Sequence, residues 1–327
     1  MTNQYPILVT GAGGEVGSVS GDIVRRLIQH GYPVRAFVRS DDARAEALRA
    51  TGAEVFVGDL LSLADVTQAV KGCRRIFFTM SLSPYYLDAN LIMIAAALKE
   101  ENIEVFVNIS EIEQTYMTFE HMSASKAHRL EWLGGLVDDW SPQQRAHWVA
   151  EQALNWSGIP AVHLRATLFM ENPLLTWFPI KNIMDRGELN LPFGNARLSP
   201  IAATDVAEVC TNILIEPEIH VGNAYALTGP ELLSATDIAE KLSNVLGYDV
   251  QYVPQSLEAS DHMLDTVLAE RSAHTAAHLK VLTRLVAGGR YEEVTTTLAN
   301  LLKRSPTHLK DALASNVRVQ RARARRS

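Results

Sequence analysis

The first half of the chain alternates short apolar runs with segments whose apolar residues recur at three- and four-residue spacing. The runs have the length and the side chains of buried strands, and the segments between them have the period of amphipathic helices. Six runs fit this pattern: Ile7–Thr10, Val34–Val38, Glu54–Val57, Arg75–Thr79, Glu104–Ile109 and Ala161–Leu164. Strands that alternate with helices predict βαβ units. We therefore expect an α/β fold with a doubly wound parallel sheet.

After the sixth run the pattern changes to loop-rich segments, then helices and a few short strands. We expect a first domain over residues 1–170, with a long insertion at about 111–141, and a smaller, mainly helical C-terminal lobe over 171–317. Parts of this lobe are expected to return to the first domain. Residues 318–327 carry five arginines and no acidic residue. This block is short and lacks aromatic residues for base stacking, so a solvated, disordered tail is favoured over a nucleic-acid contact.

A glycine-rich turn follows the first run and precedes an amphipathic helix that His30-Gly31 should end. Residues 8–17 read LVTGAGGEVG, whereas the spacing G-x-G-x-x-G would need a glycine at Val16. Glycines permit a tight turn and a close approach to a pyrophosphate, and helix N–H groups face that anion. The residues expected to cradle a dinucleotide here are Gly11, Gly13, Gly14, Glu15, Val16 and Gly17.

The end of the second run indicates which dinucleotide is bound. Arg39 and Ser40 follow Val34–Val38, and an arginine at this place pairs with the extra phosphate of NADP, where an acid would bind the ribose of NAD. NADP(H) is therefore favoured over NAD(H). Asp41 and Asp42 would face the ribose if the strand ended later.

Two further strand ends complete the expected cofactor site. Asp59 can accept from the adenine amino group while Leu60 packs beside the ring, although Asp59 or Ser62 could instead cap the next helix. Thr79 ends the fourth run and Met80 follows it, and both would lie along the ribose and pyrophosphate.

Composition indicates what kind of protein the chain forms. The chain has 327 residues and a net charge of -7, and its 47% hydrophobic content is that of a globular protein. Its two cysteines, Cys73 and Cys210, lie in apolar segments and predict buried thiols rather than disulfides. The N-terminus enters a strand without a signal-like region, and no apolar run is long enough to span a bilayer. We expect a cytoplasmic protein, a monomer or homodimer, with no membrane partner.

Together, the glycine turn, Val34–Arg39, Gly58–Leu60 and the segment Phe169–Asn172 resemble the NmrA-like branch of the atypical short-chain dehydrogenases/reductases. The resemblance covers roughly Tyr5 to Leu175. It implies a Rossmann domain that binds NADP(H) and a C-terminal lobe that closes over a substrate cleft. The branch holds reductases and also cofactor-binding regulators.

The wider superfamily uses a serine and a Tyr-x-x-x-Lys pair for proton chemistry. Ser110 stands where that serine is expected, but no Tyr-x-x-x-Lys occurs in the sequence. This departure argues against an ordinary alcohol dehydrogenase or epimerase. The branch's reductases of quinones, enones and imines tolerate the loss.

His147 occupies the family's lysine position, on a helix that should begin at Ser141-Pro142 and end at Gly158. Its imidazole can bond the nicotinamide ribose or deliver a proton. A purely structural pairing with Glu151, four residues on, is the alternative. Trp148 is a candidate substrate contact.

The insertion contains aromatic residues and methionines that could line an apolar pocket over the nicotinamide, or form a lid or dimer contact. Tyr116 within it is a candidate proton donor and substrate contact. Phe169 and Met170 are expected to press on the nicotinamide or the substrate. His121, His128 and His147 lack the spacing of a compact ligand set, so no metal is expected.

These features predict an NADPH-dependent reductase of a planar, moderately apolar carbonyl, quinone, enone or imine. Ser110 or His147 would polarise the acceptor. A non-catalytic sensor of NADP(H) is the alternative function.

Overall fold

The computed structural model describes residues 5–13, 19–100, 102–269 and 272–324. The chain divides into two compact units, each built from separated stretches of sequence. The first unit comprises Met1–Gln114, Arg145–Arg165 and Thr204–Ala226, and the second comprises Thr115–Gln144, Ala166–Ala203 and Leu227–Ser327.

The first unit is built on a seven-stranded sheet with the order β3-β2-β1-β4-β5-β6-β9. The strands are β1 Ile7–Val9, β2 Val34–Val38, β3 Glu54–Val57, β4 Arg75–Phe78, β5 Val105–Glu111, β6 Ala161–Ala166 and β9 Ala224–Leu227. β1 pairs in parallel with β2 and β4, and the pairs β2–β3 and β4–β5 are parallel too. The strand order reverses beside β1, which is the arrangement of a Rossmann fold. The predicted fold class is confirmed.

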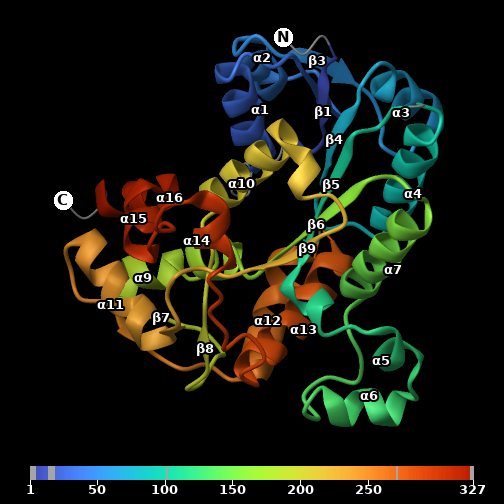
Figure 1. Cartoon of the computed structure of the whole chain (residues 1–327). Coiled ribbons are helices and arrows are strands. Elements are labelled where there is room, and N and C mark those ends of the chain that lie inside the picture. The colour runs from blue at the N-terminus through green and yellow to red at the C-terminus, as the bar shows by residue number, and fades with distance from the viewer. Residues whose placement is uncertain (1–4, 14–18, 101, 270–271, 325–327) are drawn as a thin grey trace. The chain divides into compact units, whose positions relative to one another are not determined.

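Helices cover both faces of this sheet. They are α1 Val19–Gln29, α2 Ala43–Arg49, α3 Leu63–Val70, α4 Tyr86–Ala97, α7 Pro142–Trp156 and α10 Ala203–Ile215, with short 3-10 turns η1 Ile112–Thr115 and η2 Pro217–Ile219. α3, α4 and α7 lie along one face, and α1 and α10 along the other (Figure 1). Arg26 of α1 bonds Thr204 and Glu208 of α10, which fixes these two helices together.

The core beneath α3, α4 and α7 consists of apolar side chains from strands and helices. Leu8, Ile76 and Phe106 of the sheet pack with Met93 of α4 and Leu154 of α7, all with no exposed surface. Each fully buried side chain of this size contributes roughly 1.5–3 kcal/mol to folding. Because these strands are buried, their residues are apolar, and this is why strands could be predicted from the apolar runs.

Several strand ends differ from those predicted. β1 and β4 each end one residue early, because the Thr10 hydroxyl donates to the Thr79 carbonyl and accepts from the Thr79 N–H. β5 continues two residues further, to Glu111, and β6 two residues further, to Ala166. The extension of β5 brings Ser110 into the strand itself.

Local signals explain where α1 and α7 begin or end. Gly31 follows α1 with a φ of 80°, a left-handed conformation that glycine adopts without strain. Ser141 and Gln144 bond each other's backbone N–H groups at 3.1 and 3.0 Å, which is the capping box predicted for α7.

The second unit is mainly helical. Its helices are α5 Phe119–Ser123, α6 Lys126–Trp132, α8 Pro173–Thr176, α9 Ile180–Arg186, α11 Ala235–Leu246, α12 Leu257–Leu268, α13 Ala273–Ala287, α14 Thr297–Leu302, α15 Leu309–Ser315 and α16 Val317–Ala324. Two small sheets accompany them: the antiparallel pair β8 Arg197–Leu198 with β10 Leu233–Ser234, and the parallel pair β7 Glu188–Leu189 with β11 Gln251–Tyr252.

The basic C-terminal segment differs from its prediction as a disordered tail. Val317–Ala324 form helix α16, in which Val319 and Ala322 are buried and which contacts α9, α11 and α15. The two apolar residues are three apart and so share one helix face. The high arginine content of this segment led to the prediction of a disordered tail, although these two residues give the helix an apolar face.

Both cysteines are buried and unbridged, as predicted. Burial raises the pKa of the Cys73 thiol to about 12, so this thiol is unreactive at neutral pH. Among the described residues, none of the helices combines the length and apolar character that a bilayer crossing requires.

Candidate functional site

The glycine turn after β1 has no room for a side chain at its first position. Gly11 has a φ of 68°, and an added Cβ would lie 2.8 Å from the Thr79 Cγ2 and 3.1 Å from the Thr79 carbonyl oxygen. At Gly13 an added Cβ would have no atom of the described residues within 4 Å. A close backbone crossing beside an open surface fits the cradle of a pyrophosphate. Gly14, Glu15, Val16 and Gly17 lie outside the described residues.

Arg39 directly follows β2 and is exposed. Its guanidinium makes no hydrogen bond or ion pair with any part of the chain that the structure describes, whereas the two acids after it are engaged. Asp41 pairs with Arg49 at 2.7 Å, and Asp42 caps α2. Ser40 is exposed beside Arg39. The basic group of this loop is thus the one open to an added phosphate.

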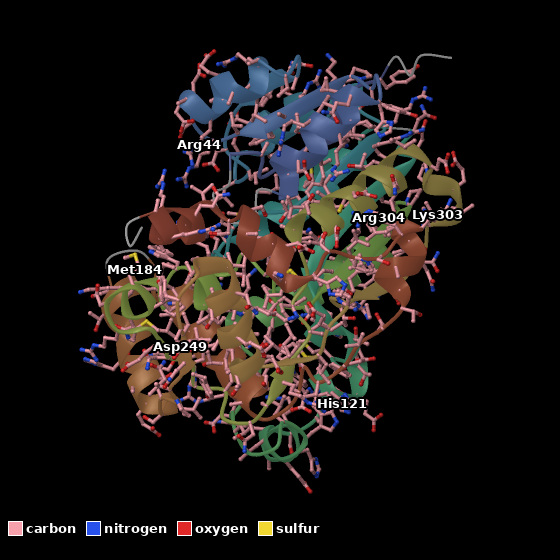
Figure 2. The ribbon with its side chains drawn as sticks, turned by 90° about the vertical axis from the view of Figure 1, so that its left-hand side faces the viewer. Arg44, His121, Met184, Asp249, Lys303 and Arg304 are labelled. Atoms are coloured by element: carbon pink, nitrogen blue, oxygen red, sulfur yellow. The ribbon has the colours of Figure 1, made fainter. Side chains whose placement is uncertain are left out.

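Arg44 is a basic residue near the turn that sequence analysis missed. It donates to the Gly13 carbonyl at 2.9 Å and to Asp42 at 2.6 Å, and it lies at the surface (Figure 2). Hydrogen bonds from Arg44 lower the pKa of the Asp42 carboxyl to about 2. The only sequence signal was its place two residues after a helix-capping aspartate.

The ends of β3 and β4 are held by local contacts. The Asp59 carboxylate accepts from the Leu61 N–H at 2.9 Å, while Ser62, not Asp59, caps α3. Leu60 and Met80 are half-buried and pack on the core described above. The cofactor roles of Asp59, Leu60, Thr79 and Met80 stay predictions.

A buried polar cluster lies where β5, β6 and α7 meet. The Ser110 hydroxyl contacts the Glu151 carboxylate at 2.5 Å, and Arg165 of β6 binds the same carboxylate at 2.6 Å. The Glu151 side chain is 1% exposed, and a buried polar group needs hydrogen-bond partners of this kind. Arg165 was not predicted, because no local pattern links residues 14 positions apart on a helix and a strand.

His147 is buried in the same region. Its ring lies 4.2 Å from the Tyr86 ring, and its Nε2 atom lies 3.8 Å from the Glu111 carboxylate at the end of β5. Burial, with Glu151 and Glu111 nearby, raises the pKa of the Tyr86 hydroxyl. Tyr86 therefore stays neutral, and its ring packs against the His147 imidazole.

A second histidine lies deeper in this cluster. His163 contacts Asn155 at 2.9 Å and Asn108 at 3.4 Å, and the Tyr86 hydroxyl reaches Asn108 at 3.4 Å. Burial lowers the pKa of His163. A neutral His163 on β6 thus connects Asn108 of β5 with Asn155 of α7.

Of the predicted substrate contacts, Trp148 lies in the first unit and is half-buried. Tyr116, Phe169 and Met170 belong to the second unit. The Tyr116 hydroxyl donates to Glu293 at 2.6 Å, and Met170 is 1% exposed in the core of its unit. Their roles in catalysis or substrate binding stay predictions.

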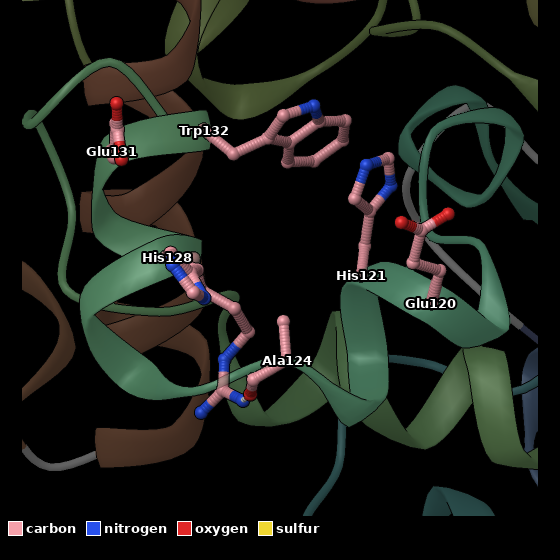
Figure 3. A pocket seen from close by; sticks show the side chains of 7 residues that line it. Glu120, His121, Ala124, His128, Glu131 and Trp132 are labelled. Carbon is pink, nitrogen blue, oxygen red and sulfur yellow. Dashed lines mark hydrogen bonds between the residues drawn. The ribbon is translucent and has the colours of Figure 1, made fainter.

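The insertion forms a surface pocket between α5 and α6, with a volume of about 340 Å³. Its lining is Glu120, His121, Ala124, His128, Arg129, Glu131 and Trp132. His121 and Trp132 point toward each other (Figure 3), with ring centres 3.8 Å apart. Of the aromatic residues and methionines of the insertion that were predicted to line a pocket, Trp132 contributes to the lining, whereas the methionines and Tyr116 take no part in it. Within the described ranges, no three acidic, histidine or cysteine side chains gather as a metal-ligand set.

The reversal of strand order beside β1 and the glycine turn that follows β1 are features of a Rossmann-type dinucleotide-binding protein. The NAD(P)H-binding family profile matches residues 11–217, and the chain belongs to this family. It is 32% identical to the NAD(P)H azoreductase of Xenophilus azovorans over 254 residues, which are 77% of this chain and 78% of the relative.

Two solved structures share the fold at lower identity. The NADPH-dependent quinone oxidoreductase QOR2 of Escherichia coli, complexed with NADPH, is 21% identical with a TM-score of 0.75, over 94% of this chain and 98% of that one. NmrA, a negative transcriptional regulator, is 18% identical with a TM-score of 0.74, over 99% of each chain. The fold resembles both an enzyme and a regulator.

Proposed function

We propose that the protein is an NADPH-dependent reductase of planar, moderately apolar acceptors: quinones, enones, carbonyls, imines or azo compounds. An NAD(P)H-dependent oxidoreductase is the class supported by its family and its azoreductase relative. The observation that carries the finer proposal is the buried Ser110–His147 region at the end of β5, in the same unit as the glycine turn.

The preference for NADPH rests on the loop after β2. Arg39 offers the added phosphate a guanidinium that no described residue binds, and Asp41 and Asp42 are already bound to arginines. Arg44 adds a second positive charge beside the turn. The dinucleotide, when bound, supplies the hydride.

His147 is proposed as the residue that polarises the acceptor or delivers its proton. It is 6% exposed, so water competes weakly for its ring, and Glu111 can stabilise a positive charge on it from 3.8 Å. Ser110 is less suited to donate, because its hydroxyl already contacts Glu151.

The reductase proposal is tested by cofactor titration followed by an acceptor panel. We expect saturable NADPH binding and steady NADPH oxidation with at least one quinone, enone, imine or azo dye. Tight NADPH binding without turnover on any acceptor would contradict the proposal and favour a regulator of the NmrA type. Failure to bind NADPH would contradict both functions.

The role of His147 is tested with His147→Gln and His147→Ala. We expect a loss of about 10²–10⁴-fold in turnover, the usual contribution of a positioned acid or base, while the fold is retained. His262→Gln, an exposed histidine of α12, is the matched control. Unchanged NADPH affinity and turnover in both His147 variants would leave this residue a structural role only.

A further inference from the structure

Ser110 is held by a carboxylate that is itself held by a guanidinium. Arg165 approaches Glu151 through Nε, at 3.3 and 3.2 Å from the two carboxylate oxygens, and through Nη2 at 2.6 Å. Ser110 Oγ lies 2.5 Å from Glu151 Oε1. The three groups come from β5, α7 and β6, so each is fixed by a different element of the first unit.

The direction of the Ser110 hydrogen bond follows from this arrangement. Arginine nitrogens only donate, so both Glu151 oxygens accept hydrogen bonds from Arg165. Ser110 must therefore donate its single hydroxyl proton to Glu151. The Ser110 oxygen then has only lone pairs left, so it can accept a further hydrogen bond but cannot donate one.

We propose that Ser110 meets the bound ligand as a hydrogen-bond acceptor, and that Glu151 and Arg165 are positioning residues that set this polarity. The inference rests on the proposed function, because it places Ser110 beside the reacting groups. The matching ligand group is an N–H or O–H donor, either the carboxamide of the nicotinamide or an amino or hydroxyl substituent on the acceptor. A serine that polarises a substrate carbonyl would need the opposite polarity.

Burial keeps the polarity fixed. Ser110 is 5% exposed and Glu151 is fully buried, so neither can exchange its partner for bulk water. An unpaired buried carboxylate is strongly unfavourable, which holds Glu151 between Arg165 and Ser110. The serine is thereby oriented before any ligand arrives.

The first test removes the hydroxyl and varies the donor on the ligand. Ser110→Ala is titrated with NADPH and with its acetylpyridine analogue, in which a methyl group replaces the carboxamide NH₂. It is also assayed with menadione, which has no N–H or O–H group, and with an amino-substituted naphthoquinone. We expect Ser110→Ala to weaken one donor-bearing ligand about 2–12-fold, as for one neutral hydrogen bond, and to leave its donor-free partner unchanged. The pair that responds identifies whether cofactor or acceptor carries the donor.

An equal effect of Ser110→Ala on both members of each pair would overturn the proposal, and so would a larger loss with the donor-free ligands. The cofactor titration needs no turnover, so it remains informative even if the wild-type protein reduces no acceptor. In that case the reductase function fails, while the polarity of Ser110 is still decided by the two cofactors.

The second test reverses the polarity. In Glu151→Gln the side-chain NH₂ can donate to Ser110 and free its proton, so the preference for the donor-bearing ligand should fall or invert. Arg165→Lys keeps a positive charge and should retain the wild-type preference at reduced affinity. Glu104→Gln removes the acid of another Glu–Arg pair, with Arg75 at 2.6 Å, and is the matched control. A Glu151→Gln protein that folds and keeps the wild-type ratio would contradict the proposed role.

Discussion

At the scale of single residues, steric room around the glycine turn separates a folding role from a binding role. Gly11 needs its left-handed backbone and lies against Thr79, whereas no described residue lies within 4 Å of a Cβ added at Gly13. The same substitution at these two positions therefore has different consequences.

We expect Gly11→Ala to lower the free energy of unfolding by about 1–3 kcal/mol, from backbone strain and the contact with Thr79, and to weaken NADPH binding. Gly13→Ala should leave stability within about 0.5 kcal/mol and still weaken NADPH, because its methyl group occupies the cradle. Urea unfolding and cofactor titration measure the two effects. Equal losses of stability in both variants would contradict this distinction.

Arg39 is the residue on which cofactor preference depends. Arg39→Ala should weaken NADPH by roughly 10–100-fold, the range for a charge-assisted contact with phosphate, and leave NADH affinity nearly unchanged. Arg25→Ala, an exposed arginine on α1, is the control. An unchanged ratio of NADPH to NADH affinity would remove Arg39 from the cofactor site.

Sequence patterns predicted the residues that act through their own backbone surroundings, such as Gly11, Gly31 and the Ser141 cap. They did not predict the Ser110–Glu151–Arg165 contact, because it joins residues 41 and 14 positions apart. That contact depends on the register of β5, β6 and α7. Periodicity identifies such elements without fixing which side chains meet.

At the scale of elements, α16 shows how charge can conceal a packed helix. Its arginines are exposed, while Val319 and Ala322 form the face that contacts its neighbours. Arg318 also lies 4.8 Å over the Trp177 ring. The composition indicated a disordered tail, but two apolar residues on one helix face allow α16 to pack on the neighbouring helices.

Val319→Asp should therefore destabilise the protein by about 2–4 kcal/mol, because it buries an unpaired charge in place of an apolar side chain. Arg321→Ser, on the exposed side of the same helix, should change stability by less than about 0.5 kcal/mol. Thermal unfolding of both variants measures the difference. Equal midpoints for Val319→Asp and the wild type would show that α16 does not pack on its unit.

At the scale of the whole molecule, the parallel sheet and the return of later segments to the first domain were predicted, whereas the bounds of the two compact units were not. Six of the seven strands of the sheet could be recognised in the sequence as apolar runs. The βαβ connections between them allow few alternative strand orders. The two compact units instead interleave three stretches each. This depends on long-range contacts such as Arg75 with the Leu214 carbonyl at 2.7 Å, which leave no local pattern.

Buried histidines make the stability of the molecule depend on pH. His278 is 4% exposed, its Nδ1 contacts the Ser141 hydroxyl at 3.0 Å, and burial lowers its pKa to about 4. In the unfolded chain its pKa is about 6.5. Between these values the unfolded chain binds a proton that the folded chain does not, so stability is complete above about pH 6.5 and falls as the pH approaches 4.

At pH 5 this single group should cost about 2 kcal/mol relative to pH 7.5. His278→Gln should flatten the dependence by that amount, whatever its effect on stability at neutral pH. The exposed His262→Gln should keep the wild-type slope, and His163, whose pKa is also lowered, contributes in the same direction in both variants. Urea midpoints measured at both pH values give the slopes. The same pH slope for His278→Gln and the wild type would mean that protonation of His278 is not what weakens the fold in acid.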